Sequence, residues 1–257
     1  MNNQNYYPVK VLEKSFLILD LLHKNGSPTS ITEISSKLSI YTSTVYRILS
    51  TLKSGGFVEQ DLKSQRYFLG LKFVEFGASK LQNMDFVKAI LPHLKRLREK
   101  FNETVHLGVR RENEILYLAK EESSQTIRMF SRIGNRCPIH CTGLGKTILA
   151  HLSVKERNEI LEQTKLIPYT ENTIADTTIF EKELSAIRKQ GFAIDDEEHE
   201  KDVFCIAVPV INFEKKVIAA ISISIPKFRI NPKKIKKIKE ALIEASDEIS
   251  ENFGAKK

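Results

Sequence analysis

Apolar positions recur at helical spacing in three short segments near the start of the 257-residue chain. The first segment carries the stripe Leu12, Phe16, Leu19 and Leu22, and it ends at the turn residues 25–28. The second begins at Ser30, which forms a capping-box pattern with Glu33. The third carries the stripe Val45, Ile48, Leu49 and Leu52, and Gly55 ends it. These patterns predict three consecutive helices.

Two short strand-like stretches follow at 57–60 and 66–69, and the polar residues 61–65 between them predict a hairpin. Three helices followed by a two-stranded wing form a winged helix-turn-helix, whose third helix enters the major groove of DNA. The predicted third helix has an acid-free polar face, which suits contacts to phosphates and base edges, although an ordinary solvated face is the alternative. The DNA-contacting residues that we predict are Thr42, Ser43, Thr44, Tyr46, Arg47 and Ser50 on the helix, with Lys63, Gln65 and Arg66 in the wing.

Helical spacing resumes at 71–84 and again up to Phe101, where Pro92 predicts a kink or a break. We therefore expect a winged domain at 1–70, a linker helix at 71–84 and a second domain at 85–257. Strands of the second domain are predicted at 104–109, 114–119, 126–130, 203–211 and 217–225. Antiparallel strands with segregated helices indicate the α+β class.

The last predicted strand places two hydroxyls on one face of the sheet. Ser222 and Ser224 share that face with residues 218 and 220, whereas 217, 219, 221, 223 and 225 share the other. Cys205 on the neighbouring strand, and Asp195 before that strand, can lie beside the hydroxyls. A few polar groups among apolar ones are typical of a small-molecule pocket, and a solvated sheet face is the alternative.

The stretch TGLGKT at 142–147 is similar to the end of a phosphate-binding loop, but His140 occupies the position of that loop's first glycine. A nucleotide hydrolase is therefore disfavoured. Thr142 is instead the predicted N-cap of a helix whose buried side carries Ile148, Leu149 and Leu152. Free N–H groups at such a helix start can hold an anion, and a plain cap with packing glycines is the alternative.

The formal net charge of +8 lies at the two ends of the chain. Residues 1–80 hold ten Lys and Arg against six Asp and Glu, and residues 227–257 hold nine against five, so the middle is neutral. Basic ends can attract nucleic acid or be merely solvated. No apolar run approaches the roughly 20 residues that cross a bilayer, and the start lacks the apolar centre of a signal peptide. We expect a cytoplasmic protein that does not bind a membrane.

Cysteines and histidines allow two rival functions. A thiol enzyme would need Cys141 or Cys205 beside a base, for which the candidates are His140, His151 and His199. A metal sensor would draw its ligands from Cys137, His140, Cys141, His199 and Cys205. The three cysteines lack CxxC spacing and are expected to be free thiols. We expect no enzyme activity and no cofactor, and leave open whether a metal binds near the cysteines.

The segment ITEISSKLSIYTSTVYRILSTLKSGGFVEQDLKSQRYFLG resembles the DNA-binding domain of IclR-type bacterial transcriptional regulators. Two later stretches, RCPIHCTGLGKTILAHL and GFAIDDEEHEKDVFCIAVPVINFEKKVIAAISISIP, resemble the effector-binding domain of that family. The resemblance implies a GAF/PAS-like antiparallel sheet flanked by helices in the second domain. It also implies a homodimer or homotetramer that binds a double-stranded DNA operator and responds to a small-molecule effector, commonly an organic acid or an aromatic compound.

The same resemblance implies which residues form the effector pocket. These residues are Met129, Cys137, Gly143, Leu144, Asp195, Val203, Cys205, Ser222 and Ser224. Cys137 stands where the family usually has a bulky apolar residue, and Asn212 and Lys215 or Lys216 replace the usual Asp and Gly of a hairpin loop. Neither the effector, the operator sequence nor the direction of regulation is implied.

Overall fold

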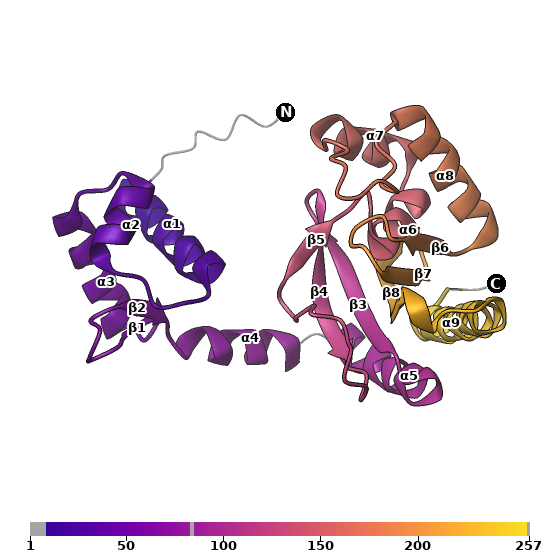
Figure 1. Ribbon diagram of the computed structural model, residues 1–257, viewed down its shortest axis with the longest axis horizontal. Helices are drawn as coiled ribbons and strands as arrows, with labels where there is room; N and C mark the ends of the chain where they lie inside the picture. Colours follow the sequence, from indigo (N-terminus) through magenta and orange to yellow (C-terminus); the bar gives the residue numbers. More distant parts are fainter. Residues whose placement is uncertain (1–8, 83–84, 256–257) are drawn as a thin grey trace. The chain divides into compact units, whose positions relative to one another are not determined.

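The computed structural model describes residues 9–82 and 85–255 (Figure 1). The chain divides into two compact units, Met1–Asn83 and Met84–Lys257. We predicted a winged domain at 1–70 and a linker helix at 71–84. These limits divide the chain more finely than the two units do, and they stay predictions. Residues 83 and 84 lie outside the described part.

The first unit contains the predicted helices and hairpin. Its elements are α1 (Lys10–Asn25), α2 (Ile31–Leu38), α3 (Thr42–Ser54), β1 (Val58–Gln60), β2 (Tyr67–Leu69) and α4 (Lys72–Gln82). β1 and β2 are antiparallel, and Thr29 adds an isolated bridge to Tyr67. Ile18, Ile34 and Val45 are fully buried at the centre of the three-helix core. The winged helix-turn-helix is thereby confirmed.

Local signals at the helix ends were reliable. The Ser30 hydroxyl accepts the Glu33 N–H at 3.3 Å, and the Glu33 carboxylate accepts the Ser30 N–H at 2.9 Å, so the capping box is formed.

The predicted stripe of α1 is only half correct, because Leu12 and Phe16 are 51% and 62% exposed while Leu22 is buried. Leu12 and Phe16 instead line an open apolar groove together with Ile48 of α3 and Phe73.

The second unit has an antiparallel sheet between two layers of helices (Figure 1). Its elements are α5 (Asp85–Phe101), β3 (Thr104–Arg111), β4 (Glu114–Glu121), β5 (Arg136–Pro138), α6 (Gly143–His151), α7 (Val154–Gln163), α8 (Thr177–Gln190), β6 (Ala193–Asp196), β7 (Val203–Ile211), β8 (Val217–Pro226), η1 (Lys227–Arg229) and α9 (Pro232–Asn252). The strand order is β5-β4-β3-β8-β7-β6. Helices α5 and α9 pack on one face, and α6 and α8 cover part of the other. The α+β class is confirmed.

One strand predicted for the second unit was wrong. Residues 126–130 are an irregular loop, in which Lys120 Nζ donates to Met129 O and Arg229 donates to Ile127 O. The short strand that pairs with β4 is β5 instead. Of the kink or break predicted at Pro92, the break is absent, because helix α5 continues through that residue, and the kink stays a prediction.

The predicted alternation of β8 holds only from residue 219 onward. Ala219, Ile221, Ile223 and Ile225 pack with α5 and α9 as one face, but Val217 packs on the opposite side and residue 218 takes its place. The register shifts between Val210 and Ile211 of β7, and such a bulge inserts one residue and reverses the alternation. The hydroxyl face of Ser222 and Ser224 lies beyond the bulge and is as predicted.

Candidate functional site

The polar face of α3 is open to solvent. Thr42, Ser43, Tyr46, Arg47 and Ser50 are exposed, and Thr44 is half-buried. The opposite side of α3 is buried in the helical core, and the helix contains no acidic residue. The exposed face therefore offers hydroxyls, a phenol and one guanidinium without a negative charge that would repel phosphate.

The three predicted wing residues differ in their surroundings. Lys63 is exposed at the tip. The Gln65 side chain donates to Leu62 O at 2.9 Å and accepts from Gln60 Nε2 at 2.9 Å, which shapes the turn. The guanidinium of Arg66 is bonded to the Glu33 carboxylate and points toward α2.

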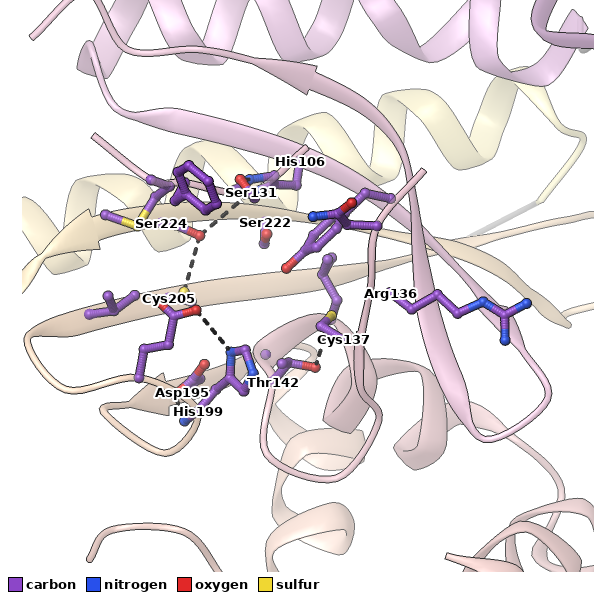
Figure 2. Close-up of a pocket in the computed structure, with 18 residues that line it drawn as sticks. His106, Ser131, Arg136, Cys137, Thr142, Asp195, His199, Cys205, Ser222 and Ser224 are labelled. Carbon is purple, nitrogen blue, oxygen red and sulfur yellow. Dashed lines mark hydrogen bonds and ion pairs between the residues drawn. The ribbon is translucent and has the colours of Figure 1, made fainter. Parts of the chain in front are cut away.

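All nine residues predicted for the effector pocket line one cavity of about 150 Å³ in the second unit (Figure 2). Sequence reasoning missed half of the lining. The missed residues are His106, Tyr117, Phe130, Ser131, Asn135, Arg136, Thr142, His199 and Glu200. Alternation along β3 could have indicated His106, whereas the loop residues had no local signal. Figure 2 shows the Arg136 side chain directed away from the other labelled residues, and its guanidinium pairs with Glu114 at 3.0 Å.

The register of the sheet brings the polar side chains together. Asp195 of β6 lies opposite Cys205 of β7, and Cys205 lies opposite Ser224 of β8. In the next row Ser222 lies opposite His106 of β3. Directly opposed residues share a face of the sheet, so these five side chains form the sheet wall of the cavity.

A chain of hydrogen bonds links this wall to the loop that closes the cavity. Cys205 Sγ donates to Ser224 Oγ at 3.1 Å, and Ser224 Oγ lies 3.4 Å from His106 Nδ1. His106 Nε2 lies 2.6 Å from Ser131 Oγ. Burial, assisted by the charge of Lys120, lowers the pKa of His106 to about 3. The imidazole is therefore neutral, with one ring nitrogen as donor and the other as acceptor.

Asp195 fixes the turn that follows β6. Its Oδ1 accepts the N–H of Glu198 at 2.8 Å and that of His199 at 3.4 Å, so this carboxylate caps and orients the loop. Burial raises the pKa of Asp195 to about 7 despite these bonds. The Glu198 side chain in turn pairs with Lys146 of α6, which is fully buried and also meets Glu183 at 3.2 Å.

Helix α6 begins at the cavity as predicted. Thr142 caps it by accepting the Gly145 N–H at 3.3 Å. A Cβ on Gly145 would lie 2.0 Å from the Ile139 carbonyl oxygen, so this glycine permits close packing of the helix start. Gly143 and Leu144 line the cavity, and no acceptor among the described residues takes their N–H groups.

The three cysteines are buried or half-buried. All three are free, and burial raises the pKa of each, to about 11 for Cys137 and well above the ordinary value for Cys205. The bonding partner of Cys205 is Ser224 rather than a histidine. Residues 9–82 and 85–255 contain no group of three or more His, Cys, Asp or Glu side chains placed to hold a metal ion.

A winged DNA-binding head and a separate unit with a ligand-sized cavity define a class, the transcriptional regulators that respond to a small molecule. The comparisons with known proteins agree. Residues 11–62 match the model of the IclR helix-turn-helix domain, and residues 78–251 match that of the bacterial transcriptional regulator IclR C-terminal domain. The chain belongs to the IclR family of bacterial transcriptional regulators, with a DNA-binding and an effector-binding domain.

Individual relatives cover nearly the whole chain. The HTH-type transcriptional regulator KdgR of Dickeya chrysanthemi is 40% identical over 94% of this chain and 79% of its own length. The crystal structure of the Thermotoga maritima IclR is 34% identical, with a TM-score of 0.79 over 96% of this chain and 100% of that one. An IclR homologue from Microbacterium hydrocarbonoxydans, complexed with 4-hydroxybenzoate, shares the fold at 23% identity and a TM-score of 0.82 over 96% of this chain and 100% of that one.

No helix among the described residues is long and apolar enough to cross a membrane.

Proposed function

We propose that the exposed face of α3 reads the major groove of an operator and that the wing tip contacts its backbone. The observation that carries this proposal is the acid-free face of Ser43, Arg47 and Ser50, flanked by Thr42, Thr44 and Tyr46. Arg47 is the one guanidinium on it, and a bidentate contact to guanine is the commonest specific contact of arginine. Lys63 and Gln65 lie at the wing tip, where phosphates are within reach.

Two substitutions test this surface. Arg47→Ala should lose about 1–3 kcal/mol of operator affinity and relax the base preference, and Lys63→Ala should weaken all sequences alike and lower the salt slope by about one. The assay is fluorescence anisotropy with a duplex selected in vitro against the wild-type protein, at several salt concentrations. Unchanged affinity and preference in Arg47→Ala would exclude direct readout by that side chain.

The effector that fits the cavity is a small organic acid with hydroxyl groups. The N–H groups of Gly143 and Leu144 at the start of α6 suit a carboxylate. Ser222, Ser224 and the Asp195 carboxyl on the facing sheet wall suit hydroxyls. Met129, Val203 and Leu144 supply apolar contacts, and Cys137 and Cys205 supply soft ones. An aromatic acid is the second candidate, since a homologue of the same fold was solved with 4-hydroxybenzoate.

A thermal-shift screen of hydroxylated and aromatic carboxylic acids tests the effector class. A true effector should raise the melting temperature and change operator affinity, because a ligand that binds the native state stabilises it. Ser222→Ala should weaken that shift, whereas Ser185→Ala on the exposed side of α8 should not. Binding of a matched neutral alcohol as tightly as the acid would contradict a carboxylate at α6.

We also propose that the chain acts as a homodimer or higher oligomer through the head. Val11, Leu12 and Phe16 of α1 and Phe73 of α4 are exposed apolar residues that line one groove of the first unit, and such a patch marks an interaction surface. A two-fold protein would match a two-fold operator. Phe16→Glu should lower the apparent mass in sedimentation velocity, and an unchanged mass would place the interface elsewhere.

Catalysis is not part of the proposed function, because the matched relatives are regulators and Cys205 donates to Ser224. A DNA-binding regulator of a bacterium would work in the cytoplasm.

A further inference from the structure

The wing is fastened to α2 by one bidentate ion pair. Arg66, at the root of the wing, donates from Nη1 to Glu33 Oε2 at 3.1 Å and from Nη2 to Glu33 Oε1 at 3.2 Å. Nη1 also donates to the Pro28 carbonyl at 3.2 Å. A guanidinium has five N–H donors in a fixed fork, and three of them are used within the head. Because three donors are already bonded within the head, the guanidinium has little freedom to turn toward DNA.

Glu33 joins three segments at this point. Its carboxylate accepts the Ser30 N–H at 2.9 Å and so completes the capping box of α2. The same carboxylate receives both nitrogens of Arg66. The Ser30 bond, together with the charge of Arg66, lowers the pKa of Glu33, so the carboxylate is ionised at neutral pH. The first turn of α2 and the wing are thus connected through one side chain.

Backbone pairing supports the same connection. Thr29 and Tyr67 exchange two hydrogen bonds of 2.8 Å each, so β2 pairs with the segment just before α2. This bridge lies next to Arg66 in the sequence and holds the strand at Tyr67, whose ring is buried in the helical core. The planar bidentate pair adds a second attachment, and both of its hydrogen bonds fix the orientation of the guanidinium.

We infer that Arg66 is a positioning residue, which sets the angle of the wing relative to the recognition helix through Glu33, and that it does not contact DNA itself. The inference rests on the proposed function of the wing. Of the wing residues predicted from the sequence, Lys63 and Gln65 then remain as contacts. The pair is about half-exposed, with both side chains at 43%, so its own contribution to folding is small, and its effect lies in geometry.

Substitution of Glu33 separates the two roles by the sign of the effect. If Arg66 held a phosphate, Glu33→Gln would remove a negative charge near DNA and release the guanidinium, so affinity would rise. If Arg66 positions the wing, Glu33→Gln should weaken binding about three- to tenfold, as expected for the net loss of one hydrogen bond. Arg66→Lys keeps the charge but not the fork, so it should weaken binding as much as Arg66→Ala does.

The experiment measures binding of the full chain to the selected duplex by fluorescence anisotropy at four salt concentrations. The inference expects Glu33→Gln, Arg66→Ala and the double variant to lose similar affinity, with a salt slope equal to that of the wild type. Phosphate contact instead predicts a slope reduced by about one in Arg66→Ala, additive losses and nearly full affinity in Arg66→Lys. Any of these three results would overturn the inference.

Two controls make the outcome unambiguous. Glu75→Gln breaks a comparable exposed ion pair with Lys72, whose atoms lie 2.7 Å apart on α4 of the same unit, and it should leave affinity unchanged. Lys63→Ala should reduce the salt slope in the same assay. If Lys63→Ala and Arg47→Ala were also without effect, the proposed DNA surface would fail rather than the role of Arg66. Circular dichroism melts verify that each variant is folded.

Discussion

Replacing Asp195 by Asn should remove a pH dependence from the stability of the effector-binding domain. The pKa of Asp195 is raised by burial from its ordinary 3.8 to about 7, so the native state keeps this proton at pH values where the unfolded state has lost it. The free energy of unfolding therefore falls as the pH rises from about 4 to 7, and is constant above that. About three pH units at about 1.4 kcal/mol each give roughly 4 kcal/mol.

The variant suits this test because it removes the charge and little else. An amide oxygen at position 195 can still accept the backbone N–H groups of Glu198 and His199, which lie 2.8 and 3.4 Å from Oδ1. Urea unfolding followed by circular dichroism between pH 4.5 and 8 yields the difference in unfolding free energy between Asp195→Asn and the wild type. That difference should shift in favour of the variant by roughly 3 kcal/mol between pH 4.5 and 8, because the rest of the effect lies below pH 4.5.

The exposed carboxyl of Glu171 supplies the control, since Glu171→Gln removes a charge without relieving any burial. Its difference from the wild type should stay nearly constant with pH. Two results would show that the native carboxyl is ionised throughout. The difference in unfolding free energy between Asp195→Asn and the wild type would vary by less than about 1 kcal/mol with pH, or it would shift in favour of the wild type as the pH rose. The explanation by burial would then be wrong.

Two further predictions concern α6 and its surroundings. Gly145→Ala should destabilise the chain by about 3 kcal/mol or more, because the new Cβ would lie 2.0 Å from the Ile139 carbonyl oxygen; Gly77→Ala on α4 meets nothing within 4 Å and should be neutral or stabilising by up to about 1 kcal/mol. Glu198→Gln removes one of the two countercharges of the fully buried Lys146 and leaves Glu183, so it should cost about 1–3 kcal/mol. Thermal melts measure both predictions. Equal melting temperatures for Gly145→Ala and Gly77→Ala would contradict the close packing at Gly145. An unchanged melting temperature in Glu198→Gln would contradict the role of Glu198 as a countercharge of Lys146.

Elements governed by neighbouring residues were predictable from the sequence. The capping box at Ser30 and the cap at Thr142 formed as expected, because the groups that satisfy the first N–H groups lie within three residues of each other. Hairpins were found for the same reason. The facing of Cys205 and Ser224 followed from strand alternation and the hairpin register.

Features set by distant residues were not predictable. The segment 126–130 has strand-like composition, but Lys120 and Arg229 take its carbonyls and prevent a ladder. The bulge opposite Val210 cannot be recognised from the sequence of β8 alone. Alternation grouped Asp195, Cys205, Ser222 and Ser224, whereas the other pocket residues were assigned through the family resemblance. That His106 lies opposite Ser222 depends on pairing between strands about a hundred residues apart.

The alternation of β7 and β8 separates two tasks within single strands. Cys205, Ser222 and Ser224 point to the cavity, whereas their immediate neighbours Phe204 and Ile223 point into the layer shared with α5 and α9. A substitution at a cavity position can therefore alter the chemistry of the cavity without opening a hole in the hydrophobic layer. If the cavity holds the effector as proposed, a few independent changes can adapt the same architecture to a new effector.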